Sequence, residues 1–242
     1  MVFSLQALEA VIVDLDGTMV DTLGDFEVAL NRMLAQFGLP AVNRAFIERT
    51  VGKGSEHLIA QTLEFVKNTA NVSVISSYDA TNNKVHGFVK KPADMPTLAQ
   101  AYDAYQSHYL AVNGLHSAVY AGVRDGLDAL RARGLKLACL TNKPTAFALP
   151  LLKAKGLDGY FCHVFGGDAF ARKKPDPLPL LETCKALGTL PARTLMLGDS
   201  SNDALAARAA GCPVVLVTYG YNHGEPIRSV DADGFVDSLL EL

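Results

Sequence analysis

The sequence has few cysteines, and none of them is spaced like a metal ligand or a redox pair. The four cysteines, Cys139, Cys162, Cys184 and Cys212, lie far apart and form no CxxC pair, which argues against a zinc knuckle or a thioredoxin-like motif. Cys139 lies within an apolar run and Cys212 directly before another, so we expect both in the core as small apolar residues. Free cysteines are typical of a reducing compartment, and we expect a cytoplasmic protein.

The features of nucleic-acid-binding and membrane proteins are also missing. The net charge is −3, and the one dense basic group, residues 172–174, is too short to form a nucleic-acid-binding surface. No apolar run approaches the ~18 residues that a membrane span needs, and residues 1–13 contain no basic leader or small-residue cleavage site. We therefore expect a soluble monomer or homodimer with no nucleic-acid or membrane partner.

What remains is an ordinary globular composition. Hydrophobic residues make up 49% of the 242 residues and charged residues 19%, which excludes a disordered chain. This length is enough for one large domain or two modest ones.

From residue 120 onward, apolar runs of strand length alternate with helical patterns. Strands are expected at 135–140, 164–165, 194–197 and 214–217, and helices at 123–133, 145–155, 177–187 and 204–210. This alternation predicts a parallel, doubly wound sheet. The buried strand expected at 10–13 belongs to the same sheet, although about a hundred residues separate it from the others.

The intervening block is mainly helical. Helices are expected at 26–37, 44–50, 56–67 and 98–112, from apolar residues at helical spacing. The fold class is therefore α/β, with a Rossmann-like core (1–18 and 118–242) and an inserted, mainly α-helical cap domain (19–117). Within the cap, the polar stretch 68–96 contains Gly and Pro and a β-branched patch at 72–75, which indicates an inserted loop or small hairpin.

Polar groups follow the predicted strands at four points. They are Asp14 and Asp16, Thr141 and Asn142, Lys174, and Asp199 with Asp203. Ligands of an open parallel sheet bind at the carboxyl ends of its strands, so these groups should converge. Clustered carboxylates need a cation, and a site with only oxygen ligands suits Mg²⁺. A hydroxyl, an amide and an ammonium are the donors that hold a transferring phosphoryl group.

These segments resemble the four signatures of the haloacid dehalogenase superfamily. Residues 11–18 (VIVDLDGT) are similar to the first signature, Thr141 to the second, Lys174 to the third and residues 198–203 (GDSSND) to the fourth. Each signature alone is weak, because short acidic strings arise by chance. Four of them in the right order, at predicted strand ends, are a specific signal.

The resemblance implies roles for the acidic residues. Asp14 would be the nucleophile that forms an aspartyl-phosphate, and Asp16 the acid and base for the leaving oxygen and the hydrolytic water. Mg²⁺ would be held by the Asp14 side chain, the backbone carbonyl of Asp16 and Asp199. Asp203 would orient Lys174 or the water shell of the metal.

The resemblance also implies a set of substrate contacts. Thr141 and Lys174 would bind the phosphoryl oxygens, with Asn142 nearby and Thr18 as a further candidate. The loop 51–54 (VGKG) is similar to a cap substrate loop, where Lys53 would meet a small carboxylate. Lys53 is equally compatible with an exposed turn.

The substrate is suggested by a narrower resemblance. Residues 216–226 (LVTYGYNHGEP), 141–144 (TNKP), 166–168 (GGD) and 173–177 (KKPDP) are similar to segments of bacterial phosphoglycolate phosphatases. A phosphatase of a small phosphate monoester, 2-phosphoglycolate above others, is therefore expected. The stretch 68–96 departs from that family's pattern.

Several alternatives stay open at this point. The substrate could instead be a sugar phosphate or pyrophosphate. A phosphomutase, or a phosphonatase with Lys53 as its Schiff-base lysine, would use the same fold, and a non-catalytic phosphate-binding protein would use it without turnover. The acidic residues also have purely structural alternatives, since Asp14 and Asp16 could cap a turn and Asp199 and Asp203 a helix start.

Overall fold

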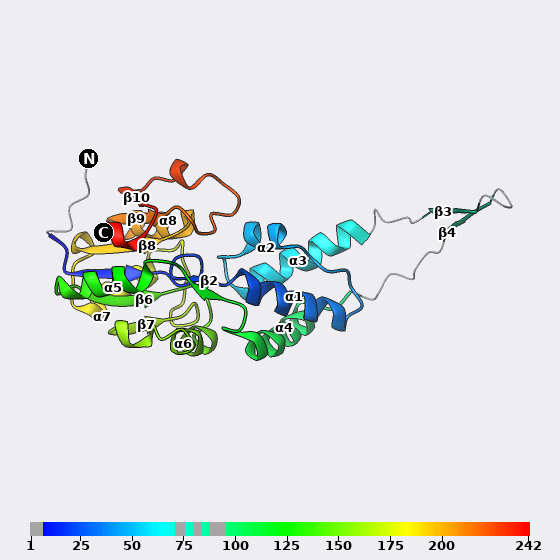
Figure 1. The fold of residues 1–242 in the computed structure, drawn as a ribbon, viewed down its shortest axis with the longest axis horizontal. Helices are drawn as coiled ribbons and strands as arrows, with labels where there is room; N and C mark the ends of the chain where they lie inside the picture. Colours follow the sequence, from blue (N-terminus) through cyan, green and yellow to red (C-terminus); the bar gives the residue numbers. More distant parts are fainter. Residues whose placement is uncertain (1–6, 71–75, 80–83, 88–94) are drawn as a thin grey trace.

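The centre of the fold is a six-stranded parallel sheet in the order β10-β9-β8-β1-β6-β7 (Figure 1). The computed structural model of the chain describes residues 7–70, 76–79, 84–87 and 95–242. The strands are β1 (Ala10–Val13), β6 (Lys136–Leu140), β7 (His163–Phe165), β8 (Thr194–Gly198), β9 (Val214–Val217) and β10 (Gly234–Val236). All four residues of β1 are buried, because the strand has neighbours on both sides and helices on both faces.

Two pairs of helices cover the two faces of the sheet. They are α5 (Val123–Ala132) and α6 (Thr145–Ala154) on one face, and α7 (Leu178–Leu187) and α8 (Ser201–Ala210) on the other. Alternate residues of a strand point to opposite faces. Accordingly, Val11 and Val13 pack in the cluster with α5 and α6, whereas Ala10 and Ile12 pack in the cluster with α7 and α8.

The predicted core elements are present, with ends shifted by up to three residues. The largest shift is in α8, which begins at Ser201 because Ser200 and Asp203 form a capping box there. The sequence does not predict β10, which has only three residues and lies at the edge of the sheet. Within the described part of the chain, no helix combines the length and apolarity needed to cross a bilayer.

The helices inserted between β1 and β6 form a second unit with a core of its own (Figure 1). They are α1 (Leu23–Gln36), α2 (Arg44–Thr50), α3 (Ser55–Ala70) and α4 (Leu98–Val112). Their apolar faces meet at side chains such as Leu30, Ile47 and Ile59, each with no exposed surface. The α/β fold with a helical insertion is thus the predicted one.

The polar stretch predicted as a loop or hairpin begins later than expected, because α3 continues to Ala70. Strands β3 (Ser76–Asp79) and β4 (Lys84–Gly87) pair antiparallel within it, so the hairpin is confirmed. The β-branched patch at 72–75 lies outside the described residues.

A short two-stranded ribbon joins the helical unit to the sheet domain. Strand β2 (Val20–Asp21) pairs antiparallel with β5 (Ala118–Val119). These strands are where the chain enters the helical unit and where it returns, so both connections run side by side (Figure 1). The sequence does not predict either strand, because two residues carry no periodicity.

We predict that Ile12→Ala destabilises the protein by about 2–5 kcal/mol, because it leaves a cavity in the central strand. The Ile12 side chain is fully buried between the sheet and α7–α8. The control is Leu205→Ala on α8, because Leu205 is 58% exposed. We expect this substitution to change the free energy of unfolding by no more than about 0.5 kcal/mol. Urea unfolding measures both, and equal effects would contradict this account of the core.

Candidate functional site

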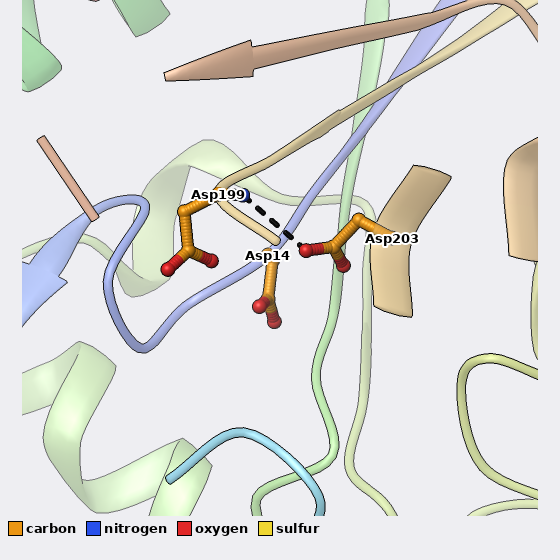
Figure 2. Close-up of side chains that lie close together, drawn as sticks. All are labelled: Asp14, Asp199 and Asp203. Carbon is orange, nitrogen blue, oxygen red and sulfur yellow. Dashed lines mark hydrogen bonds between the residues drawn. The ribbon is translucent and has the colours of Figure 1, made fainter. Parts of the chain in front are cut away.

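Three carboxylates meet at the carboxyl ends of the central strands. Asp14 follows β1, Asp199 follows β8, and Asp203 lies in the first turn of α8. Figure 2 shows the three side chains directed toward one region, and one oxygen atom from each lies within 4.8 Å of the others. The convergence expected from the sequence is therefore present for these residues.

The turn after β1 brings its backbone against Asp199. Gly17 has φ of +83°, and a Cβ atom built there would lie 2.1 Å from Oδ2 of Asp199. Gly220 also lies against this residue, where a Cβ atom would be 2.2 Å from the Cβ of Asp199. Both positions therefore need glycine.

Two donors fix the Asp199 carboxylate in this narrow space. The Thr18 hydroxyl donates to Oδ1 at 3.1 Å, and the Tyr221 N–H donates to Oδ2 at 2.6 Å. Thr18 is fully buried and is not among the residues that line the pocket. The structure therefore pairs Thr18 with Asp199 outside the lining of this pocket, and the substrate contact suggested by the sequence stays a prediction.

Tyr221 also contacts the start of the helical unit. Its hydroxyl accepts the Thr22 N–H at 2.9 Å and donates to Oδ1 of Asp21 at 2.5 Å. One tyrosine thus bonds a carboxylate of the cluster through its backbone, and the β2 connection through its side chain.

Lys174 lies between two of the carboxylates. Its ammonium is 2.7 Å from Oδ1 of Asp203 and 3.0 Å from Oδ1 of Asp14, and it donates to the Leu140 carbonyl at 2.9 Å. The contact with Asp14 is an ion pair, whereas Asp203 and Leu140 accept hydrogen bonds from the ammonium. The other oxygen of Asp203 accepts hydrogen bonds from Ser200 at the start of α8. Asp203 thus both caps the helix and pairs with Lys174, the two possibilities that the sequence left open.

Burial and mutual repulsion act strongly on the cluster. Burial raises the pKa of Asp14 to about 7, against the opposing charge of Lys174 and with a further contribution from Asp203. Burial, then the charges of Asp203 and Asp14, raise the pKa of Asp199 well above its ordinary value. Burial alone would lower the pKa of Lys174, but the charges of Asp14 and Asp203 outweigh it and raise that pKa.

A cation fits this cluster. When all three carboxylates are ionised, their charges and that of one lysine leave two negative charges unbalanced, and every available donor of Asp14, Asp199 and Asp203 is an oxygen atom. Oxygen donors and a charge deficit of two are what a hard divalent ion requires.

The carboxylate of Asp16 is held apart from this cluster. Its two oxygens accept hydrogen bonds from the Lys143 ammonium at 3.0 and 3.2 Å, and the same ammonium donates to the Tyr109 hydroxyl at 2.6 Å. In the sequence-based prediction, the backbone carbonyl of Asp16, and not its side chain, binds the metal. The pairing of the Asp16 carboxylate with Lys143 is therefore compatible with that prediction. Lys143 was not predicted as a site residue, although it directly follows Thr141 and Asn142 in the TNKP segment.

The second strand-end segment contributes both Thr141 and Asn142 to the lining of the pocket. Thr141 lines the pocket, and its hydroxyl accepts the Lys143 N–H at 3.2 Å, which leaves its own proton to donate. The Asn142 amide nitrogen donates to the carbonyls of Gly52 at 3.0 Å and Lys174 at 2.9 Å. Asn142 therefore ties a loop of the helical unit to the Lys174 loop.

Lys53 lies outside the pocket that contains Asp14. Its neighbours Gly52 and Gly54 line that pocket, but the exposed Lys53 side chain lines a separate, open depression beside His57 and Lys173. The loop therefore offers its backbone to the pocket, while its lysine faces the neighbouring cleft.

The pocket itself is small and largely enclosed. Its volume is about 40 Å³, a few times the ~10–15 Å³ that one water molecule needs. The sheet domain supplies the polar floor, and the helical unit supplies mainly aromatic and apolar walls that include Phe26, Leu58, Tyr105 and Tyr109. A small anionic molecule is the ligand that suits this combination.

Comparisons with known proteins agree with this geometry. The family model of haloacid dehalogenase-like hydrolases matches residues 8–211. A protein of Thiobacillus denitrificans named phosphoglycolate phosphatase is 41% identical over 234 residues, which are 97% of this chain and 93% of that protein. A protein of Cupriavidus necator named phosphoglycolate phosphatase, plasmid, is 40% identical over 96% of this chain and 90% of its own. The crystal structure of a predicted phosphoglycolate phosphatase from Haemophilus somnus has a TM-score of 0.85 at 29% identity, covering 98% of this chain and 97% of that one.

We predict that Asp14→Asn raises the melting temperature of the metal-free protein at pH 8, and raises it less at pH 5. The folded pKa of Asp14 is about 7 against an ordinary 3.8, so its contribution to stability is lost as the pH rises from about 4 to 7. Above pH 7 the Asp14 carboxylate is ionised and its buried charge destabilises the folded protein. The neutral Asn side chain removes this charge. Thermal unfolding in EDTA at both pH values measures the difference.

Asp168→Asn is the control of opposite sign. Partial burial tends to raise the pKa of the Asp168 carboxyl, but hydrogen bonds from Thr145 outweigh this effect and lower that pKa. The ionised carboxylate therefore stabilises the fold, and its replacement by an amide should lower the melting temperature at pH 8. A lower melting temperature for Asp14→Asn at pH 8 would contradict the electrostatic account of the cluster.

Proposed function

The chain belongs to the haloacid dehalogenase-like hydrolase family, and we propose that it is a phosphatase that hydrolyses 2-phosphoglycolate to glycolate and phosphate. The observation that carries this proposal is the meeting of Asp14, Asp199, Asp203 and Lys174 in one small pocket. Full-length relatives at about 40% identity that are named phosphoglycolate phosphatase support the choice of substrate.

In the first half of the reaction, an oxygen of Asp14 attacks phosphorus and the bond between phosphorus and the glycolate oxygen breaks. Asp16 donates a proton to the departing glycolate oxygen. The products of this step are glycolate and an aspartyl-phosphate on Asp14. Both carboxylates line the pocket, which supports these two roles.

In the second half, water attacks phosphorus and Asp16 accepts its proton. The bond between phosphorus and the Asp14 oxygen breaks, which restores the carboxylate and releases phosphate. Asp16 thus ends the cycle with the proton that it gave up in the first half.

Lys174 and Thr141 are the proposed ligands of the phosphoryl oxygens. Lys174 is a fixed cation 3.0 Å from the nucleophile, and the Thr141 hydroxyl lines the same pocket with a proton to donate. Preorganised donors of this kind stabilise the charge that develops in phosphoryl transfer. Asn142 also lines the pocket and stays a proposed neighbour of the substrate, and its amide supports the loop that carries Lys174.

Mg²⁺ is the proposed metal, held by Asp14 and Asp199 with the backbone carbonyl of Asp16, and with Asp203 on its outer side. When bound, it neutralises the carboxylates and the charge of the phosphoryl group. Asp199 is prepared for this role by Thr18 and the Tyr221 N–H, which fix its orientation.

We also propose that the core consists of residues 1–18 and 118–242 and the cap of residues 19–117. The protein is proposed to be cytoplasmic, and to be a monomer or a homodimer. The β2–β5 ribbon lies at both proposed boundaries, which supports this division. A phosphonatase is disfavoured, because Lys53 lines the neighbouring depression and not the pocket.

We predict that Asp14→Asn lowers kcat for 2-phosphoglycolate by a factor on the order of 10³ or more, while the protein stays folded. The amide has no anionic oxygen with which to attack phosphorus. Asp103→Asn, which alters an exposed carboxylate on α4, is the matched control and should leave kcat unchanged. Phosphate release measures both, and wild-type turnover by Asp14→Asn would exclude the aspartyl-phosphate route.

We predict that EDTA abolishes activity and that Mg²⁺ restores it, because the carboxylate cluster carries an unbalanced charge without a cation. Ca²⁺ should bind and restore little activity, since it prefers more ligands at longer distances than Mg²⁺. Activity after dialysis against EDTA and readdition of each metal provides the test. Full activity in the metal-free protein would refute the metal requirement.

A further inference from the structure

The pocket contains two buried ammonium groups, and the chemistry proposed above uses only one. Lys174 lies beside Asp14 on the floor of the pocket, whereas Lys143 lies beside Asp16 and reaches Tyr109 of the cap helix α4. Each lysine side chain is 2% exposed. Burying a lysine is costly unless it is well paired. Asp16 and Tyr109 pair with Lys143, and they fix its ammonium in a pocket for phosphate esters, where it can also meet an anion of the substrate.

Tyr105 presents an unused donor in the same pocket. The residue is fully buried and lines the pocket, yet its hydroxyl has no hydrogen-bond partner among the described residues. Its ring centroid lies 5.5 Å from that of Tyr109, the phenol bonded to Lys143. An unpaired buried hydroxyl is destabilising, and a ligand in the pocket would supply the missing acceptor.

The donors at this end of the pocket stay protonated. Burial, followed by the charge of Asp16, raises the pKa of Tyr105 well above its ordinary value, and the same two causes raise that of Tyr109. Tyr109 accepts the Lys143 N–H and so keeps its own proton. One ammonium and two neutral phenols form a cluster rich in donors.

The surroundings of this cluster strengthen any ion pair formed there. The Lys143 ammonium lies 4.7 Å from the ring centroids of Phe26 and Tyr109, and Leu58 and Phe147 line the same pocket. Such walls exclude water and lower the local dielectric constant, so that an anion placed against the ammonium binds more strongly than at the surface.

We propose that the Lys143 ammonium and the Tyr105 hydroxyl form a subsite for the carboxylate of the substrate and so select phosphorylated acids. This subsite rests on the proposed function. The phosphoryl end of the substrate lies against Asp14 and Lys174, and its carboxylate end against Lys143 and Tyr105, so each buried cation meets one anionic end. An ester without a carboxylate leaves the Tyr105 hydroxyl unpaired in the closed pocket, and a site built to pair a polar group rejects such an analogue.

The test compares wild type and Tyr105→Phe on 2-phosphoglycolate and on ethyl phosphate, which has a methyl group in place of the carboxylate. Loss of a hydrogen bond to a charged group should lower kcat/KM for 2-phosphoglycolate by about tenfold or more, mainly through KM. The value for ethyl phosphate should stay within about twofold. Tyr102→Phe, which removes a hydroxyl from the same helix outside the pocket, is the matched control and should change neither.

Folding is checked on the same variant. Because the Tyr105 hydroxyl has no hydrogen-bond partner in the described part of the chain, Tyr105→Phe should melt at the wild-type temperature or above it. A clear drop would mean that the hydroxyl has a structural partner and would overturn the subsite. As a second variant, Lys143→Met should raise KM for 2-phosphoglycolate but not for ethyl phosphate, and should lower kcat for both, since Asp16 loses its partner.

The outcomes separate the subsite from the proposed function. If wild type prefers 2-phosphoglycolate and Tyr105→Phe keeps that preference, the subsite is wrong and the phosphatase stands. If wild type hydrolyses ethyl phosphate as efficiently as 2-phosphoglycolate, the proposed substrate is wrong and the subsite falls with it. A preference that collapses only in Tyr105→Phe and Lys143→Met supports both.

Discussion

The buried ammonium of Lys174 is the contact on which the floor of the site depends. It bonds carboxylates from two distant parts of the chain, Asp14 after the first strand and Asp203 in the first turn of α8. Without it, three carboxylates would face one another in a region that excludes water, and repulsion would separate the loops that carry them. The ammonium balances one of the charges, and the remaining deficit suits a divalent ion.

The strand order explains how so short a first segment can supply the proposed nucleophile. Strand β1 lies in the middle of the sheet, between β6 and β8, so its end lies beside those that precede Thr141 and Asp199. The helical insertion leaves after β1 and returns before β6 through one ribbon, which keeps the sheet continuous. The chain can thus place about a hundred residues over the site without disturbing the strands that build it.

The sequence predicts the floor of the site better than its walls. Asp14, Asp199 and Lys174 follow strands or a strand-end loop, and the geometry of a parallel sheet brings such positions together whatever the details. The direction of a side chain within a loop depends on contacts that sequence patterns do not contain, which is why the sequence does not predict the bond of Thr18 to Asp199 or the depression that Lys53 lines. Lys143 and Tyr105 escaped prediction because their meeting depends on how the helical unit sits on the sheet domain. The short strands β2, β5 and β10 carry too few residues for any periodicity.

Tyr221 has a consequence for motion between the two units. Its backbone holds the carboxylate of Asp199, and its phenol holds Thr22 and Asp21 at the ribbon. A rotation of the helices about that ribbon must therefore either break the phenol's bonds or drag the 218–222 loop along. In the second case, opening the enclosure would displace a donor from Asp199, one of the proposed metal ligands. Access to the site and affinity for a metal ion would then be mechanically linked through the side chain of Tyr221.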